Sequence, residues 1–352
     1  MIEQLAYELE TDLILMIAKY LKTGTYGAAD WRIKKLGQLS LVNKETLEVI
    51  SKYKARILSG IDKEMNVSAE IFLKEVRATL PPALGRELTM TEGLRNIVTS
   101  WVESAKSETN IAMAKLAQSA GQSYVNAVSK ASLAVLSGAD THKAALERAI
   151  GELDSLDAFV SKTVGTDGKE HIRRWTPEGY IATVIRSNSA RAVNEMQIGV
   201  ADELGTDLVE VTSHIGARPL CFPYQGKILS LRGETPGYMT LAETSYGEKA
   251  GLLGINCGHR LIPYVKGVSE KAEKTDYSKA ENDTVYKESQ QQRALERSIR
   301  NAKREQAKWE SYGDKQKAQA WGARVKEKQA NMRTFINGTD RTRRYDREQV
   351  YT

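Results

Sequence analysis

Apolar residues recur every three or four positions over nearly half of this chain, and only seven prolines interrupt its 352 residues. This spacing places apolar side chains on one face of a helix, so residues 1–160 are predicted to form helices that pack through that face. The pattern disfavours a β-sandwich or barrel with many proline-marked turns. The first stripe consists of Ile2, Leu5, Leu9, Leu13, Met16, Ile17 and Tyr20.

Sequence signals separate these helices from one another. Pro81 and Pro82 end a helix, because proline lacks the amide hydrogen and restricts the residue before it. The segment 89–92, TMTE, matches a capping box and predicts a new helix. Gly138 predicts a stop and residues 140–141 predict the next cap, after which the apolar spacing predicts helix to about residue 160.

A change of character follows at residues 164–169, whose turn sequence predicts a domain boundary. A helix with Pro177 at its first position is predicted over 176–204. Strands are predicted at 208–212 and 226–231 from β-branched and alternating residues. Loops rich in glycine and proline fill the rest of this part of the chain.

Three regions result: a helical interaction region at 1–164, a compact α+β module at 165–267 and a basic helical tail at 268–352. The predicted fold class is therefore mainly α. The tail contains 20 Lys and Arg against 14 Asp and Glu, a net charge of +6. This is the same as the net charge of the whole chain. Because residues 1–267 are neutral overall, nucleic-acid binding by the main body is not expected.

The tail has strong helix formers but few large apolar residues. We expect one or two long exposed helices that pack on partners, or that are partly disordered when alone. Its apolar residues are too sparse for an independent core. They are Leu295, Ile299, Trp309, Trp321 and Val325.

Three other features of the sequence indicate the compartment in which the chain is made. No apolar run approaches the roughly 20 residues that a transmembrane helix needs. The first ten residues carry acids where a basic leader would stand, so no signal peptide is expected. Two cysteines exclude a disulfide scaffold, and synthesis inside a cell is the expectation.

The segment 205–267 holds both cysteines of the chain, Cys221 and Cys257, and two of its four histidines, His214 and His259. One interpretation is a zinc site with one His and one Cys from each of two loops, since zinc accepts tetrahedral Cys₂His₂ ligation. The alternatives are buried thiols with histidines that bond to loop backbone, or a Cys221–Cys257 disulfide, which a reducing compartment disfavours. Without a Cys-x-x-Cys or His-x₃-His pair, the expectation is no cofactor, with zinc as the alternative.

Catalysis is not expected. Cys257 and His259 are two residues apart, and in a strand such a pair does not aim one reactive atom at the other. The chain also lacks the zinc-deaminase signature, His-Glu-x-x-His, Gly-x-Ser-x-Gly and the phosphate-loop motif.

The same segment resembles the C-terminal signature of phage minor capsid proteins of the minor capsid 2 type, which are related to MuF-like head-morphogenesis proteins. The resemblance covers residues 175–267, extends loosely over 1–174 and is absent over 268–352. Unlike many MuF-like domains, this chain has no further cysteines after Cys257. The matching residues are His214-Ile215-Gly216-Ala217-Arg218-Pro219, Cys221, Tyr224-Gln225-Gly226-Lys227, Tyr246-Gly247, Gly251-Leu252, Asn256-Cys257-Gly258-His259 and Pro263-Tyr264, with Arg186-Ser187 and Arg191 on the preceding helix.

The resemblance implies a structural protein without catalytic activity. Such proteins are few-copy components of the virion, placed in the head interior or at the portal vertex, and present in the host cytoplasm during assembly. They assist head assembly, DNA packaging or DNA delivery. The implied partners are the portal protein, the major capsid protein, packaged DNA and further copies of the chain, with no membrane.

Two other functions stay open at this point. The first is a metal-dependent enzyme or effector built on 165–267, with Glu210, Glu234 and Glu243 available as general acids or bases. The second is a non-specific DNA binder that acts through phosphate contacts of the tail, against the alternative of a solvated helix face of mixed charge. Its densest basic cluster is Arg341, Arg343, Arg344 and Arg347.

Overall fold

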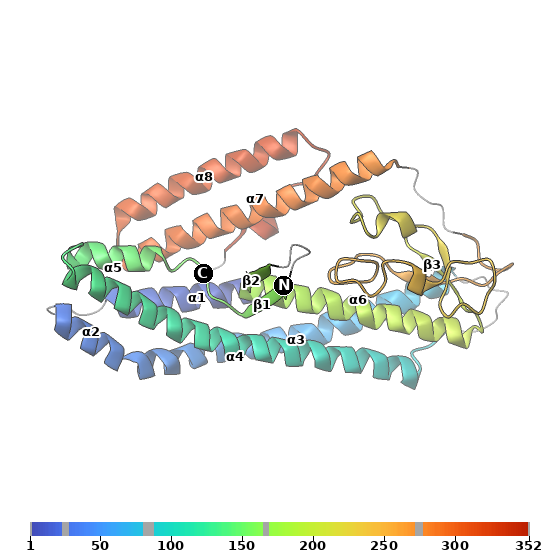
Figure 1. Cartoon of the computed structure of the whole chain (residues 1–352), viewed down its shortest axis with the longest axis horizontal. Coiled ribbons are helices and arrows are strands. Elements are labelled where there is room, and N and C mark those ends of the chain that lie inside the picture. The colour runs from blue at the N-terminus through green and yellow to red at the C-terminus, as the bar shows by residue number, and fades with distance from the viewer. Residues whose placement is uncertain (1, 23–27, 80–87, 165–168, 272–276, 351–352) are drawn as a thin grey trace. The chain divides into compact units, whose positions relative to one another are not determined.

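The computed structural model describes residues 2–22, 28–79, 88–164, 169–271 and 277–350. These residues are mainly α-helical, as predicted (Figure 1). The helix break predicted at Pro81 and Pro82 lies outside the described residues. The long helices are α1 (Ile2–Lys22), α2 (Ala28–Gly37), α3 (Leu39–Thr79), α4 (Glu92–Leu136), α5 (His142–Gly151), α6 (Pro177–Glu203), α7 (Lys279–Tyr312) and α8 (Lys315–Asn337).

The chain forms two compact units, each built from separate stretches of sequence. Unit 1 contains Met1–Leu58, Thr109–Ala182 and Gln292–Thr352, and unit 2 contains Ser59–Glu108 and Thr183–Gln291. Four helices, α3, α4, α6 and α7, contribute residues to both units. The division of the sequence into three regions, with boundaries at residues 164 and 267, stays a prediction.

Helix α1 forms the centre of the unit 1 core. Six residues of its predicted apolar stripe are buried, and Tyr20 is half-buried and donates a hydrogen bond to Glu45 at 2.7 Å. The helix also buries residues between those of the stripe, among them Tyr7, Glu10 and Ile14. A helix buried on most of its circumference needs partners for its polar groups, and α7 provides them.

Helix α7 contributes a row of buried charged side chains to unit 1. Arg304 pairs with Glu10 at 2.8 Å, and both side chains are almost fully buried. Arg300 pairs with Glu178 at 2.6 Å. Lys308 donates to Glu305 at 2.6 Å and to the carbonyl of Leu153 at 2.8 Å. The expectation that the tail has only exposed helices is therefore wrong for α7, because paired charges replace part of the missing apolar surface.

The large apolar residues of the tail helices are also buried or half-buried. Ile299, Trp309 and Val325 are buried, while Leu295 and Trp321 are half-buried. The residues after α8 return along α7: Gln292 donates to the carbonyl of Thr342 at 3.0 Å. The C-terminal segment thus packs on the chain itself.

Helix α5 ends at Gly151, so the prediction of helix to about residue 160 is wrong. Leu153 and Leu156 are buried as their spacing suggested, but from a segment without regular secondary structure. This segment is held by side chains distant in sequence, since the amide of Leu156 donates to Glu10 at 2.8 Å. Buried apolar spacing alone does not distinguish a helix from such a segment.

A β-hairpin follows that the sequence analysis did not predict. Strand β1 (Phe159–Val164) pairs antiparallel with β2 (Glu170–Trp175), with Phe159 opposite Trp175 and Val164 opposite Glu170. The predicted boundary at 164–169 therefore lies between two paired strands of unit 1. The turn chemistry is equally typical of a hairpin and of a linker.

The helix caps agree with the sequence in two cases and differ in one. Thr141 accepts from the amide of Ala144 at 3.2 Å, and Thr176 accepts from that of Gly179 at 3.3 Å, as predicted. The capping box at 89–92 is displaced, because Thr91 accepts from the amide of Leu94 and α4 begins at Glu92. Either threonine can serve as a cap, and the tertiary structure selects the second.

Unit 2 contains a three-stranded antiparallel sheet in the order β4-β3-β5. Strands β3 (Leu208–Val211) and β4 (Ile228–Ser230) confirm the two predicted strands. Strand β5 (Leu261–Pro263) was missed, because three residues show no alternation. The sheet packs in one core with Ala201 of α6, and this core contains Val209, Val211, Leu229, Leu241, Leu252 and Leu261.

The buried Glu10–Arg304 pair yields a stability prediction. Arg304→Met leaves Glu10 buried without its cation, so the free energy of unfolding should fall by about 3–5 kcal/mol. Adding Glu10→Gln removes the anion and keeps an acceptor for the Leu156 amide, so the double variant should regain much of this loss. Urea unfolding followed by circular dichroism measures both. Lys326→Met, at an exposed position of α8, is the control, and an equally large loss there would contradict the assignment.

Candidate functional site

Two loops of unit 2 bring together the four predicted ligands. The loop between β3 and β4 carries His214 and Cys221, and the segment before β5 carries Cys257 and His259. Because β3 pairs with both β4 and β5, the two loops leave neighbouring strands. The sheet thus makes neighbours of residues up to 45 positions apart in the sequence.

The thiols and one imidazole lie in direct contact. The Sγ atoms of Cys221 and Cys257 are 3.9 Å apart, and Cys257 Sγ lies 3.4 Å from His259 Nδ1. One ligand atom from each of the three residues falls within a group no more than 4.8 Å across, and all three residues are buried. Both cysteines are free thiols. Within the described ranges, this is the one such group of three His, Cys, Asp or Glu side chains.

His214 does not belong to this group of three but adjoins it through the His259 ring. The two imidazoles stack with centroids 4.3 Å apart and an angle of 28° between their planes. The Nε2 atoms of both rings are buried, and neither has a hydrogen-bond partner in the described part of the chain. Buried polar atoms without partners are costly, so these two nitrogens require an explanation.

The expectation that spacing would keep Cys257 and His259 apart is wrong. It assumed a strand, but β5 begins only at Leu261, and Asn256 has a left-handed backbone with φ of 56°. Residues 257–260 belong to no strand, and the Cys257 sulfur lies 3.4 Å from Nδ1 of His259.

The electrostatics of the cluster favour one thiolate. The hydrogen bond from Cys221 and the neighbouring His259 lower the pKa of Cys257 below that of an ordinary thiol, although burial acts in the opposite direction. The same contact with Cys257, together with burial, raises the pKa of Cys221. Burial and the neighbouring His259 lower the pKa of His214, which favours its neutral form. Thiolate and neutral imidazole are the forms that ligate metals.

Arg218 joins the two loops that carry the cluster. Its guanidinium donates to the carbonyl of Ile255 at 2.8 Å and to that of Gly251 at 3.0 Å. Ser245 adds a second connection, donating to the carbonyl of Leu220 at 2.7 Å and accepting from the amide of Leu252 at 3.0 Å. Motif residues that suggested function from the sequence therefore position the loops.

Asn282 of α7 fixes the first loop from outside the sheet. Its fully buried side chain accepts from the amides of Gly216 and Ala217 at 2.9 and 2.8 Å and donates to the carbonyl of Ala217 at 2.9 Å. Gly216 has φ of 82° and lies close to Val285, so a side chain there would be crowded. Gln225 accepts from the amide of His214 at 2.8 Å. The sequence analysis missed Asn282, which lies far outside the motif.

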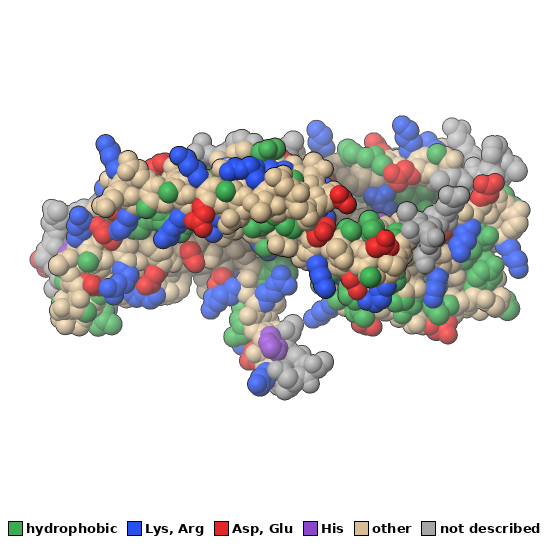
Figure 2. All heavy atoms as spheres, turned by 90° about the horizontal axis from the view of Figure 1, so that it is seen from above, with side chains coloured by type: hydrophobic (Ala, Val, Ile, Leu, Met, Phe, Trp, Pro, Cys, Tyr) green, Lys and Arg blue, Asp and Glu red, His purple; other side chains and the backbone are tan. Residues whose placement is uncertain are grey.

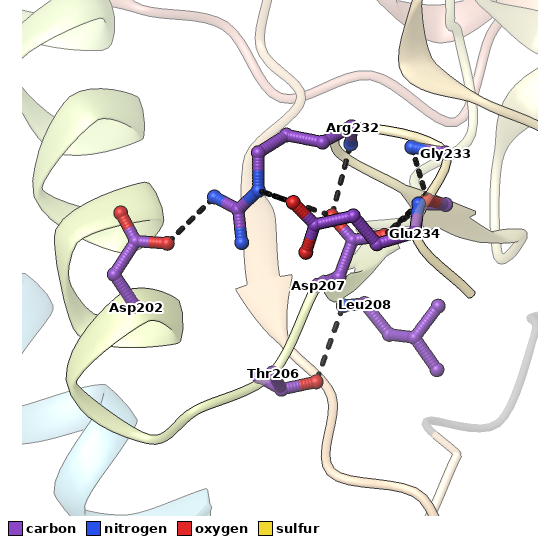
Figure 3. A network of polar contacts seen from close by, with 8 residues as sticks. Asp202, Thr206, Asp207, Leu208, Arg232, Gly233 and Glu234 are labelled. Carbon is purple, nitrogen blue, oxygen red and sulfur yellow. Dashed lines mark hydrogen bonds and ion pairs between the residues drawn. The ribbon is translucent and has the colours of Figure 1, made fainter.

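A second polar network holds the other end of the sheet (Figure 3). Asp207, just before β3, accepts from Ser230, from the amide of Arg232 at 2.9 Å and from that of Glu234 at 3.1 Å. Burial by itself would raise the pKa of Asp207, but these hydrogen bonds and the Arg232 guanidinium hold it below its usual range. The carboxylate thereby fixes the turn that follows β4.

The proposed acid–base residues have local structural roles. Glu234 pairs with Arg232 at 3.0 Å, and Glu243 accepts from the amide of Thr240 at 2.7 Å in a capping box. Glu210 is buried within β3. None of the three forms part of the group of metal-ligand atoms.

The basic cluster at the C-terminus is partly used within unit 1. Arg343 makes two hydrogen bonds to the buried Glu348, at 2.7 and 2.6 Å. Arg341 donates to Gln292 at 2.5 Å. Arg347 is half-buried and Arg344 is exposed. DNA binding by this cluster stays a prediction.

Comparison with known proteins identifies the family. The chain matches the family described as phage minor capsid protein 2 over residues 3–337. It therefore belongs to the phage minor capsid protein 2 family and is a phage structural protein. The match reaches beyond residue 267, so the expectation of no resemblance over the tail is wrong. No helix among the described residues is long and apolar enough to cross a membrane.

Two relatives are phage proteins. The chain is 29% identical over 341 residues to a structural protein of Lactococcus phage LL-H, an alignment that covers 92% of this chain and 89% of the relative. It is 34% identical over 116 residues to a structural protein of Lactococcus phage mv4, which covers 33% of this chain and 94% of that relative. No solved structure matches the chain.

The Asp207 network yields a pH-dependent prediction. Asp207→Asn removes the charge that accepts the three donors, so unfolding should become about 1–3 kcal/mol easier near neutral pH. The pKa of Asp207 is lower in the folded state than its ordinary value of 3.8. The ionised carboxylate therefore stabilises the folded state fully at pH values above 3.8, and this stabilisation is lost as the pH falls through the folded-state pKa.

Thermal unfolding of the wild type and Asp207→Asn from pH 7 to pH 3 measures this effect. The difference between the two melting temperatures should shrink below pH 3.8. Asp202→Asn removes only the half-exposed ion pair with Arg232 and serves as the control, with a small effect at every pH. A wild-type advantage that stays constant down to pH 3 would contradict the role of the carboxylate.

Proposed function

We propose that this chain is a few-copy component of the phage head, located at or beside the portal, which assists head assembly and DNA packaging or delivery. Its membership in the phage minor capsid protein 2 family over residues 3–337 carries this proposal. The position and the step assisted are what the resemblance implies for such proteins. The portal and major capsid proteins are the proposed partners.

Exposed aliphatic side chains on the helices of unit 1 support an interaction role. Five of them lie on α2, on the first turns of α3 and at the end of α4, and each is more than half exposed. We name this group the exposed aliphatic set. Large aliphatic side chains in such numbers on neighbouring elements are typical of protein–protein contact surfaces. Its members are Ile33, Leu41, Leu47, Leu133 and Leu136.

Incorporation into phage particles tests both the proposal and this surface. The triple variant Ile33→Ser, Leu133→Ser and Leu136→Ser should fold with an almost unchanged melting temperature, because these side chains are exposed. Its copy number relative to the portal protein should fall at least several-fold. Mass spectrometry of density-purified, DNA-filled particles measures the copy number, and cross-linking to the portal identifies the partner.

The matched control is Ile111→Ser, which removes an exposed aliphatic side chain elsewhere on α4. It should be incorporated like the wild type. If the wild-type chain is present in the lysate but absent from filled particles, the virion location is wrong. Normal incorporation of the triple variant would place the contact surface elsewhere.

The second candidate function is contact with packaged DNA through the tail. Helix α8 holds six Lys and Arg residues against one Glu. Figure 2 views the molecule from the side on which α8 lies in Figure 1, and Lys and Arg side chains are spread over that face with Asp and Glu among them. This basic excess exceeds that of the C-terminal arginine cluster, where Arg341 and Arg343 bond within unit 1.

Salt-dependent binding to duplex DNA tests this candidate. Replacing Lys315, Arg324, Lys326 and Arg333 by Gln should lower the affinity at low salt and reduce the slope of its logarithm against that of salt concentration. The matched variant carries Gln at Arg344 and Arg347 and should have the smaller effect. Fluorescence anisotropy with a labelled duplex measures both, and wild-type binding that does not weaken with salt would exclude the candidate.

A further inference from the structure

We propose that unit 2 binds one zinc ion through Cys221, Cys257 and His259, with His214 as the fourth ligand. The inference is independent of the position of the chain in the phage particle. It depends on three observations: the spacing of the ligand atoms, the unpartnered Nε2 of His214 and the burial of Cys221, Cys257 and His259.

The spacing of the ligand atoms agrees with tetrahedral zinc. Zn–S bonds of about 2.3 Å at a tetrahedral angle place two sulfurs about 3.8 Å apart, and a Zn–N bond of about 2.0 Å places sulfur and nitrogen about 3.5 Å apart. The observed distances are 3.9 Å between the sulfurs and 3.4 Å from Cys257 Sγ to His259 Nδ1. Two of the three ligand pairs therefore lie at the distances expected across a zinc ion, and all three ligand atoms lie within 4.8 Å of one another.

The unpartnered Nε2 of His214 identifies this residue as the fourth ligand. Its Nε2 is buried without a hydrogen-bond partner among the described residues, although its ring stacks on the ligand His259. Gly258 lies between the two ligands Cys257 and His259. A Cβ atom added at Gly258 would lie 3.3 Å from the His214 Nε2, so this nitrogen is close to the segment that carries both ligands. Coordination would satisfy a polar atom whose burial is otherwise unfavourable. Two sulfurs and two imidazoles suit zinc better than magnesium or calcium, which prefer oxygen.

Burial separates this proposal from a reactive thiol. A Cys–His nucleophile must reach its substrate, whereas Cys257 is 7% exposed and His259 is 2% exposed. Arg218 and Ser245 join the two loops that carry the cluster. A closed site of sulfur and nitrogen ligands is typical of structural zinc, which would join the two loops of a module with only three short strands.

The zinc content of the purified full-length chain tests the proposal. Protein purified without chelators should contain about one zinc per chain by elemental mass spectrometry. Cys221→Ser, Cys257→Ser and His259→Ala should each lose most of it. His214→Ala should retain zinc more weakly, releasing it at a lower chelator concentration than the wild type. His171→Ala, an exposed histidine in β2, is the matched control and should keep the full amount.

A measurement on the wild type alone covers variants that fail to fold. A strong chelator should lower its melting temperature and make both thiols reactive, and added zinc but not magnesium should reverse both effects. Protein that binds no zinc when offered one equivalent and melts identically with and without chelator would overturn the proposal. So would the absence of free thiols in denaturant without reductant, which would indicate a disulfide. Wild-type behaviour of His214→Ala would remove His214 from the ligand set.

Discussion

The core of unit 1 depends on charged side chains of α7 that are buried against α1 and the segment after α5. Arg304 reaches Glu10, whose other oxygen accepts from Leu156, and Lys308 reaches the carbonyl of Leu153. These contacts provide hydrogen-bond partners for backbone groups of a buried segment that has no regular secondary structure. A buried ion pair contributes little net stability, but removal of either partner is costly. The result is a helix of polar composition that is fixed in one position.

Unit 2 follows the same principle with a smaller sheet. Its three short strands provide a limited apolar core, and side chains such as Asp207, Arg218 and Asn282 hold the long loops by bonding to their backbone. This explains why the family motif is dense in glycine and polar residues. Its residues shape and join two loops, and Cys221, Cys257 and His259 are buried between them.

Much of the fold was predictable from local pattern. The apolar stripe of α1, the proline start of α6 and strands β3 and β4 followed from period and caps. The hairpin of β1 and β2 and the short β5 were missed, since each is fixed by its pairing partner more than by its own residues. Of the candidate site, the four residues named from the sequence lie close together in the fold, but Asn282 gave no signal because its partners in the first loop are backbone atoms.

The sequence by itself determined that the chain is mainly helical, that its chemistry-bearing residues lie in one segment and that this segment resembles phage minor capsid proteins. These properties follow from periodicity and from residues close together in the chain. Only the tertiary structure decided that α7 is buried, that the helix after Thr141 stops at Gly151 and that Cys257 faces His259. Each of these depends on where distant polar groups find partners, and a local pattern does not record that.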